Sequence, residues 1–307
     1  MTTHVLDRLP SGARVAIIRL RSLGDSVLTT PALSLLKQAR PDLRVAVVVE
    51  DRFAPVFAGN PDVEQILAPN AASVGRFRPH LALNLHGGAT SVRMMLAAAA
   101  GLRAGFAHFR FQPMYNLRIP RAQEILEVDR KVHTAEHLAS AMFYLGVPLT
   151  EIPRARLFAT AISRPRPYAV LHPFASEAAK TWPQENFLAV AKHLHRDLGI
   201  EPLFIGGTGE DLSAFAEFSC FQGAPLEEAK ALLAGASIFV GNDSGPAHIA
   251  AAFGRPVVVL FGSSEVDNWR PWRTENVVLT GTEGIQSLEV SQVTSAVATL
   301  APAQQSA

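Results

Sequence analysis

The chain has 307 residues, 48% of them hydrophobic and 18% charged, which suffices for two domains of about 150 residues and excludes a disordered chain. No apolar run approaches the roughly 20 residues of a membrane-spanning helix, and the N-terminus lacks the apolar core of a secretory signal. The single cysteine excludes an internal disulfide and a cysteine-based zinc cluster, so these features together predict a cytoplasmic protein.

The net charge of +1 is unevenly distributed. Residues 1–150 carry 17 Lys and Arg against 11 Asp and Glu, whereas residues 151–307 carry 11 against 16. A basic stretch in the first half comprises Arg103, Arg110, Arg118, Arg121, Arg130 and Lys131. Each of these side chains alone is most simply a solvated surface group, but together they favour an anionic partner. We expect peripheral contact with the anionic inner face of the cytoplasmic membrane and no nucleic-acid partner.

The first half of the chain predicts a βαβ unit that continues into further elements. Strands are predicted over 14–20, 44–49 and 81–85, and helices over 26–40 and 89–100. Strands that alternate with helices pair in parallel, because a parallel pair needs a long crossover connection.

The second half repeats this pattern after a Pro-containing stretch at 164–167 that cannot be helical. Strands are predicted over 168–172, 202–206, 238–241 and 256–261, and a helix over 185–198. Near-continuous apolar strands indicate sheets that helices cover on both faces.

These patterns predict two Rossmann-like α/β domains, residues 1–160 and 161–307, and leave open that the last helix packs back on the first domain. Ligands of such parallel sheets bind beyond the carboxyl ends of the strands. We therefore expect the functional residues in the loops that follow strands, around a cleft between the domains.

The loop after the first strand, Arg21-Ser-Leu-Gly-Asp, ends in Asp25 at the start of a helix. Taken alone, Asp25 is more simply a helix N-cap, which stabilises the helix by about 1 kcal/mol. The alternative is a general base that the helix dipole keeps ionised. No G-x-G-x-x-G follows this strand, so a dinucleotide cofactor is not indicated.

The segment Val240–Pro256, VGNDSGPAHIAAAFGRP, predicts a strand end, a loop and a helix. Pro246 suits the first helical position, Asp243 or Ser244 the cap, and Gly254 the C′ position. The loop thus presents free N–H groups at a positive helix end, which is a ready anion site.

Several side chains of these loops have two interpretations. Within the anion site, Gly245 allows close approach of a diphosphate, whereas His248 either contacts the ligand or is a buried histidine with one hydrogen bond. Lys180 can neutralise a phosphate to which Ser176 offers a hydroxyl, although a loop lysine is usually solvated. Trp182 more simply packs ahead of the following helix.

Glycines also follow the strand over 202–206. Gly206 and Gly207 could admit a nucleotide base or ribose, but a plain turn explains them almost as well.

Three segments together resemble the ADP-heptose:lipopolysaccharide heptosyltransferase family, glycosyltransferase family nine. They are RLRSLGDSVLTTPAL near the N-terminus, HPFASEAAKTWP in the middle and GNDSGPAHIAAAFGRPVVVLFG near the end. The resemblance implies a GT-B fold, in which two Rossmann-like domains face each other across a cleft, the first for the acceptor and the second for the nucleotide sugar. It also implies transfer with inversion and without a metal.

The resemblance further implies a role for each matching residue. Asp25 is the implied catalytic base, and the other implied contacts are Ser176, Lys180, Ser244 and Gly245 on the donor phosphates, and Asp243 and His248 on the donor sugar. From the residues themselves we expect Gly206, Gly207 and Gln222 to contact the nucleotide. Two positions depart from the family: Asn84-Leu-His86 stands where many relatives carry an aspartate and a glutamine, and Gln222 adds no charge near the ribose.

We therefore expect an inverting, metal-independent glycosyltransferase that moves heptose from ADP-heptose to a lipopolysaccharide-core or related glycan, without a cofactor. Two alternatives keep the fold: a non-catalytic relative that binds nucleotide sugars or glycans, and a nucleotide-sugar epimerase.

Overall fold

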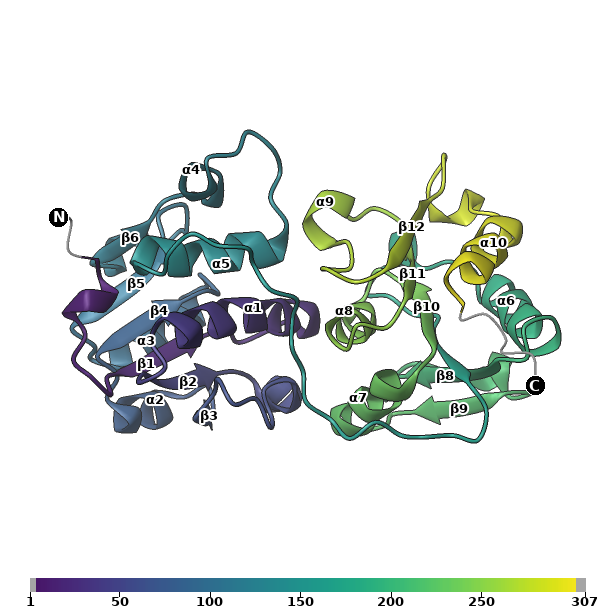
Figure 1. The fold of residues 1–307 in the computed structure, drawn as a ribbon, viewed down its shortest axis with the longest axis horizontal. Coiled ribbons are helices and arrows are strands. Elements are labelled where there is room, and N and C mark those ends of the chain that lie inside the picture. The colour runs from purple at the N-terminus through teal and green to yellow at the C-terminus, as the bar shows by residue number, and fades with distance from the viewer. Residues whose placement is uncertain (1–3, 302–307) are drawn as a thin grey trace. The chain divides into compact units, whose positions relative to one another are not determined.

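The computed structural model describes residues 4–301 and consists of two compact domains, Met1–Phe158 and Ala159–Ala307 (Figure 1). The division lies beside residue 160, where the boundary is predicted, and the outermost ends of the predicted domains, residues 1–3 and 302–307, lie outside the described residues. Each domain contains one six-stranded sheet in which every pair of neighbouring strands is parallel. The predicted α/β class with two Rossmann-like domains is confirmed.

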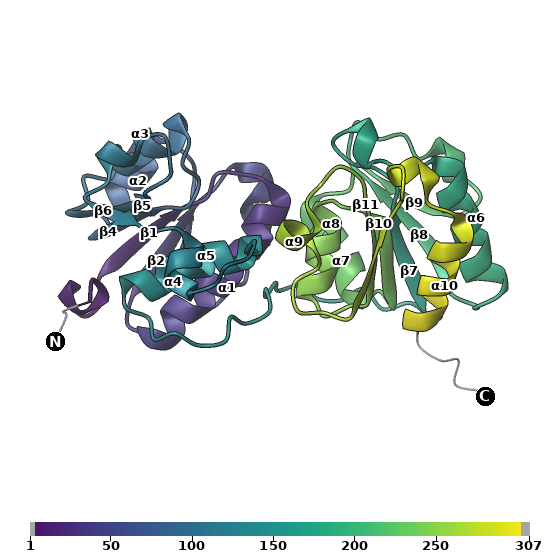
Figure 2. The ribbon, with the colours of Figure 1, turned by 90° about the horizontal axis from the view of Figure 1, so that it is seen from above.

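The first domain has the strand order β3-β2-β1-β4-β5-β6. Its strands are β1 (Arg14–Ile18), β2 (Arg44–Val48), β3 (Gln65–Leu67), β4 (Leu81–Asn84), β5 (Leu102–Phe106) and β6 (Leu117–Ile119). Its helices are α1 (Leu23–Ala39), α2 (Ala71–Phe77), α3 (Ala89–Ala97), α4 (Ala122–Leu126) and α5 (Thr134–Leu145), with 3₁₀ turns at Leu6–Arg8, Asp51–Val56 and Gln112–Met114. Helices α1 and α5 pack together on one face of the sheet, and α2 and α3 lie on the other (Figure 2).

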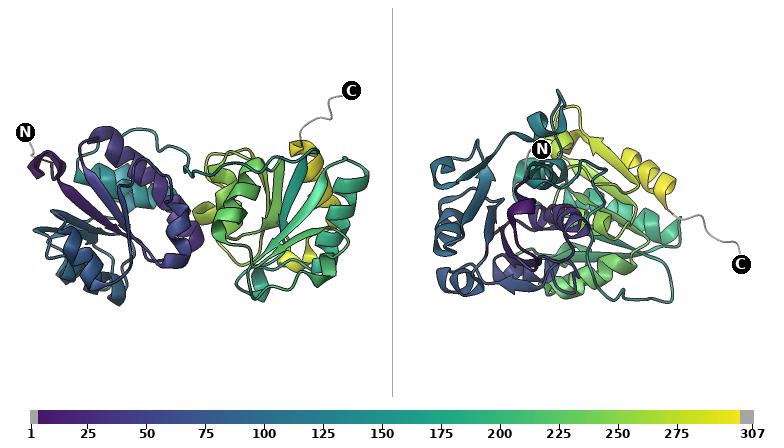
Figure 3. Two further views of the ribbon diagram at one scale, coloured as in Figure 1. Left: turned by 90° about the horizontal axis from the view of Figure 1, so that it is seen from below. Right: turned by 60° about the vertical axis from the view of Figure 1, so that its left-hand side comes forward.

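The second domain has the strand order β12-β11-β10-β7-β8-β9. Its strands are β7 (Tyr168–His172), β8 (Glu201–Gly206), β9 (Ser219–Gln222), β10 (Ile238–Asn242), β11 (Val257–Phe261) and β12 (Asn276–Thr280). Its helices are α6 (Gln184–Arg196), α7 (Leu226–Gly235), α8 (Gly245–Ala252), α9 (Val266–Trp269) and α10 (Val290–Leu300), with 3₁₀ turns at Ala178–Lys180, Ser213–Phe215 and Ile285–Ser287. The sheet lies between α6 with α10 on one face and α7 with α8 on the other (Figure 3).

Both sheets have the same topology when the strands are counted from the start of each domain. The strand order reverses between β1 and β4 in the first domain and between β7 and β10 in the second. Beyond the carboxyl ends of such strands a parallel sheet leaves a crevice for ligands, because the connections leave in opposite directions there. Each domain thus has one preferred ligand position.

The strands at these positions are buried, as their apolar sequences predict. All five residues of β7, β10 and β11 are buried, as are all four of β4. The strands that the sequence did not predict are mostly short or half-exposed: β3 and β6 have three residues each, and β9 and β12 are edge strands with exposed or partly exposed side chains. Edge strands lack the continuous apolar run by which central strands are found.

The last helix packs within its own domain. Val293, Ala296, Val297 and Leu300 of α10 belong to the core of the second domain, where α10 contacts α6, β11 and β12. The apolar face of α10 therefore covers the sheet of its own domain. None of the helices in the described residues is long and apolar enough to cross a membrane.

Candidate active site

The main predicted site residues lie in loops after strands at which the two sheets reverse. Asp25 follows β1 in the first domain, and Lys180 and Asp243 follow β7 and β10 in the second. Each group therefore lies at the preferred ligand position of its own domain.

Asp25 lies in the first turn of α1 and is not its N-cap. The helix begins at Leu23 after the N-cap Ser22, and Asp25 is the third helical residue. Its Oδ2 accepts hydrogen bonds from the backbone N and the Oγ of Ser22, at 3.3 and 3.0 Å. The prediction that Asp25 caps the helix is thus corrected: Ser22 takes that position, and Asp25 completes a capping box.

A buried arginine holds the other oxygen of Asp25. Arg19, the residue after β1, forms an ion pair with Asp25 Oδ1, and the two side chains are only 12% and 17% exposed. Nη1 of Arg19 also donates to the Leu85 carbonyl oxygen, 2.5 Å away in the loop after β4. Burial lowers the pKa of Arg19, and the charge of Asp25 opposes this shift. Arg19 therefore fixes the carboxylate between the loops after β1 and β4.

The loop after β4 is shaped by Asn84, the last residue of that strand. Its Oδ1 accepts from the backbone N atoms of His86 and Gly87, both at 3.0 Å, and its Nδ2 lies 3.1 Å from Tyr115 Oη. Burial raises the pKa of Tyr115 to about 12. Both the oxygen and the nitrogen of the Asn84 amide are therefore engaged in hydrogen bonds within the protein.

A cluster of aromatic rings, Phe106, His108 and His137, lies near Asp25 and Arg19. His137 of α5 stacks on Phe106 with ring centroids 4.0 Å apart, and His108 lies 5.5 Å from His137. Burial, His108 and the charge of Arg19 lower the pKa of His137 to about 4, whereas Asp25 acts in the opposite direction. His137 is consequently neutral at pH 7 and offers an uncharged ring surface.

In the second domain a histidine links the ends of three strands. Nδ1 of His172, the last residue of β7, lies 3.0 Å from Ser244 Oγ, and its Nε2 lies 3.4 Å from Glu210 Oε2. Glu210 also accepts from the Gly207 backbone N at 2.6 Å. Burial acts to raise the pKa of Glu210, but His172 and the Gly207 N–H outweigh it and leave that pKa below its ordinary value.

The helix after β10 begins as the sequence predicts, with one shift. Ser244 is the N-cap of α8, and Pro246 is the second helical residue, where the first was predicted. Gly254 follows the helix with φ +70°, as expected for a C′ glycine. No side chain caps the first turn, since the Ser244 hydroxyl lies against His172, and this end of the helix suits an anion.

Lys180 and Asp243 are electrostatically coupled across two loops. Burial raises the pKa of Asp243, and Ser264 and the positive charge of Lys180 partly oppose that shift. The turn Ala178–Lys180, the Lys180 turn, packs closely against Gly262. A Cβ at this glycine would collide with the Ala179 carbonyl oxygen, so only glycine allows the turn to lie there.

The same loop is anchored at its end by Trp182. Its backbone N donates to Asn242 Oδ1 at 3.1 Å, and its Nε1 donates to the Leu288 carbonyl at 2.9 Å. The Trp182 side chain is fully buried and its ring lies 5.1 Å from that of Phe187 in α6, which supports the packing interpretation. Ser176 is exposed on this loop, between His172 and Lys180.

The remaining predicted residues lie around these loops. Gly206 is opposite Gln222 in the register of β8 and β9, and both Gly207 and Gln222 are exposed. His248 is only 4% exposed, and its ring lies 6.1 Å from that of Trp269.

Four residues of these arrangements were not predicted: Arg19, His137, His172 and Glu210. Arg19 and His172 do carry a sequence signal, since each is a polar residue at the carboxyl end of an apolar strand. Glu210 and His137 carry none, because their place depends on the order of the strands and on the docking of α5. Among the described residues no three His, Cys, Asp or Glu side chains are grouped as a metal site would require.

The sequence matches a known family over most of its length. The family model described as glycosyltransferase family 9 (heptosyltransferase) matches residues 73–296. Lipopolysaccharide heptosyltransferase 3 of Escherichia coli K12 is 26% identical over 304 residues, which cover 84% of this chain and 85% of that protein.

Solved structures show the same fold. A glycosyl transferase of family 9 from Veillonella parvula has a TM-score of 0.83 at 22% identity and covers 94% of this chain and 97% of its own. The ADP-heptose heptosyltransferase II of E. coli has a TM-score of 0.78 at 20% identity, with 94% and 98% covered. These likenesses confirm the predicted GT-B fold.

Proposed function

Since the chain belongs to glycosyltransferase family 9, the heptosyltransferases, we propose that it transfers heptose from ADP-heptose to a lipopolysaccharide core or a related glycan. The predicted family resemblance and the predicted class of enzyme, a glycosyltransferase, are confirmed by this membership. The observation that carries the finer proposal is the division of charge between the two ligand positions: a held carboxylate in the first domain, and a lysine with an open helix N-terminus in the second.

The second domain binds the donor in this proposal. Lys180 and the first turn of α8, at Ser244 and Gly245, neutralise the diphosphate, and Ser176 donates a hydroxyl to it. Asp243 and His248 contact the sugar, while Gly206, Gly207 and Gln222 leave room for the nucleoside. We add Glu210 to the donor residues, because its carboxylate ends beside Gly207 and His172.

The first domain supplies the base. The acceptor hydroxyl attacks the anomeric carbon from the face opposite the diphosphate, so that a C–O bond forms, the bond to the phosphate oxygen breaks and ADP leaves with that electron pair. The hydroxyl proton passes to the Asp25 carboxylate. Arg19 is a positioning residue, which keeps one carboxylate oxygen fixed while the other is held by Ser22.

The leaving diphosphate is stabilised by protein donors, so the proposed transfer is metal-independent. Wild-type protein treated with EDTA should retain its rate, and a loss restored by one added divalent cation would contradict this part of the proposal.

The proposed place of action is the cytoplasmic face of the inner membrane, where the basic first half meets anionic lipid. The excess of 17 Lys and Arg over 11 Asp and Glu in residues 1–150 supports this contact. Binding to anionic vesicles should weaken as salt is added, and binding that does not weaken would count against an electrostatic contact.

The decisive experiment compares wild type with Asp25→Asn and Lys180→Gln, using mass spectrometry of ADP-heptose incubated with and without truncated lipopolysaccharide. We expect a glycosylated acceptor and ADP from wild type, no product but retained donor binding from D25N, and weakened donor binding from K180Q. Donor binding without turnover on any acceptor would indicate the non-catalytic alternative. An epimerised donor formed without acceptor would indicate the epimerase.

A further inference from the structure

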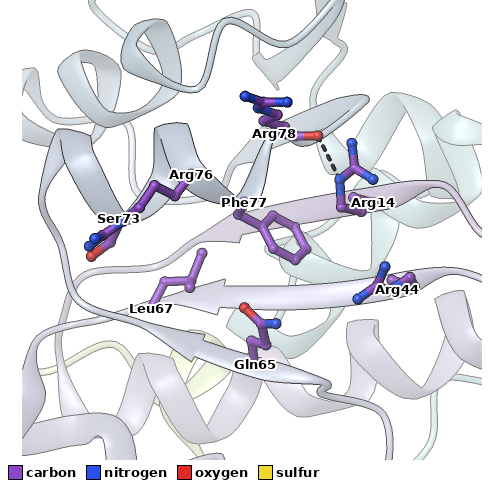
Figure 4. Close-up of a pocket in the computed structure, with 8 residues that line it drawn as sticks. All are labelled: Arg14, Arg44, Gln65, Leu67, Ser73, Arg76, Phe77 and Arg78. Atoms are coloured by element: carbon purple, nitrogen blue, oxygen red, sulfur yellow. Dashed lines mark hydrogen bonds between the residues drawn. The ribbon is translucent and has the colours of Figure 1, made fainter.

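A pocket of about 550 Å³ lies between α2 and the β1, β2 and β3 strands of the first domain's sheet (Figure 4). The lining residues are Arg14, Arg44, Gln65, Leu67, Ser73, Arg76, Phe77 and Arg78. Arg14 and Arg44 are the first residues of β1 and β2, whereas the Asp25 loop follows the last residue of β1. The pocket lies on the α2 face of the sheet, whereas Asp25 belongs to α1 on the opposite face, so the pocket is separate from the site around Asp25.

The pocket carries surplus positive charge. Four of its lining residues are arginines, and none of the described lining residues is acidic. Only one of the four is neutralised by a carboxylate in the described residues: Nη2 of Arg44 lies 2.6 Å from Glu64 Oε1, in a pair that is largely exposed. Arg14, Arg76 and Arg78 thus add positive charge that no carboxylate of the described residues balances, and this charge favours an anionic ligand.

The position of Arg78 is unusual for arginine. Arg78 is the C-cap of α2 and has a left-handed backbone, with φ 49° and ψ 60°, which favours glycine. Its carbonyl oxygen accepts a hydrogen bond from Arg14 Nε at 2.8 Å, which orients the Arg14 side chain (Figure 4). Glycine at this position would relieve the backbone strain and remove the guanidinium at the same time.

We propose that this pocket binds a multiply charged phosphate group, carried either by a soluble phosphorylated sugar or by a lipid headgroup. Arginine forks match phosphate oxygens with two parallel hydrogen bonds. Gln65 and Ser73 add uncharged polar groups, and Leu67 and Phe77 add an apolar wall. The volume lies within the range of about 300–1,000 Å³ of small-molecule sites and leaves room for the group that carries the phosphate.

The test uses inorganic pyrophosphate as the probe, titrated calorimetrically into the full chain in the presence of saturating ADP, which occupies the proposed donor site. The key variant is Arg78→Gly, which removes a guanidinium and suits the left-handed backbone, so its thermal stability should equal or exceed that of wild type. Arg14→Gln is the second variant. Arg196→Gln, on α6 of the second domain, is the control with the same loss of charge.

We expect R78G and R14Q to bind pyrophosphate about tenfold or more weakly than wild type, since each loses charge-assisted hydrogen bonds. R196Q should bind it as wild type does, and this binding is independent of sugar transfer. Absence of pyrophosphate binding by wild type, or equal binding by R78G, would overturn the proposal.

Vesicles distinguish the two sources of the phosphate. If wild type, but not R78G, co-sediments with phosphatidylcholine vesicles that contain phosphatidic acid, the phosphate is that of a lipid headgroup. If R78G loses pyrophosphate binding but sediments with these vesicles as wild type does, the ligand is a soluble phosphorylated compound. Both results support the pocket as a phosphate site.

Discussion

The pairing of Arg19 with Asp25 predicts a specific loss of stability in the first domain. Arg19→Met keeps most of the length of the side chain but removes the guanidinium. Asp25 would then remain 17% exposed without its cationic partner, and the Leu85 carbonyl would lose its donor.

The magnitude follows from these two contacts. Leaving one partner of a largely buried ion pair unpaired costs about 3 kcal/mol, and leaving a carbonyl unsatisfied adds about 1 kcal/mol. With a slope of about 2 kcal/mol per molar urea, the unfolding midpoint of the first domain should fall by about 2 M. The loss should shrink in the double variant R19M/D25N, because the neutral amide introduced by D25N leaves no unpaired charge, and the coupling should be about 2 kcal/mol.

The assay separates the two domains by their chromophores. The three tryptophans, Trp182, Trp269 and Trp272, all belong to the second domain. Urea unfolding followed by tryptophan fluorescence should therefore be unchanged in R19M, while circular dichroism, which sees both domains, should show the earlier transition.

The enzymatic activity of R19M should fall together with the stability of its first domain. R19M should lower kcat for transfer and leave ADP affinity as in wild type, because the donor residues lie in the other domain. Additive effects in the double-variant cycle, or a wild-type kcat in R19M, would refute the role of Arg19 as the residue that positions Asp25.

Three further predictions concern the second domain. Lys180→Gln should weaken ADP-heptose binding about tenfold in calorimetry, whereas Lys192→Gln, on the outer helix α6, should not; equal effects would contradict a phosphate contact. Gly262→Ala should displace the Lys180 turn and reduce donor affinity with little change in acceptor binding, and unchanged donor affinity would show that this turn does not hold the phosphate. The pKa of Glu210 is lowered in the folded protein, so the stability that this carboxylate contributes is fully present above its ordinary pKa of 4.5 and is lost as the pH falls from there through the folded-state pKa. Glu210→Gln should flatten this part of the stability–pH curve, and an unchanged slope would argue against the contact with His172.

Much of the fold could be predicted from local sequence. Buried central strands such as β7 and β10 appear as continuous apolar runs, and the loops that follow them are the places where a parallel sheet binds ligands. Asp25, Lys180 and Asp243 could be proposed for this reason, and because each lies in a contiguous segment whose sequence resembles the family.

The partners of these residues could not be predicted, because they come from distant parts of the chain. Arg19 is bound to Leu85, 66 positions away, and His172 to Ser244, 72 positions away. Such pairs depend on which strands become neighbours, and apolar periodicity reports the burial of a strand but not its neighbour. The sequence therefore determined the apolar central strands, the loops that follow them and the candidate base. The tertiary structure alone decided what holds that base, since the reversal of strand order brings the ends of β1 and β4 together.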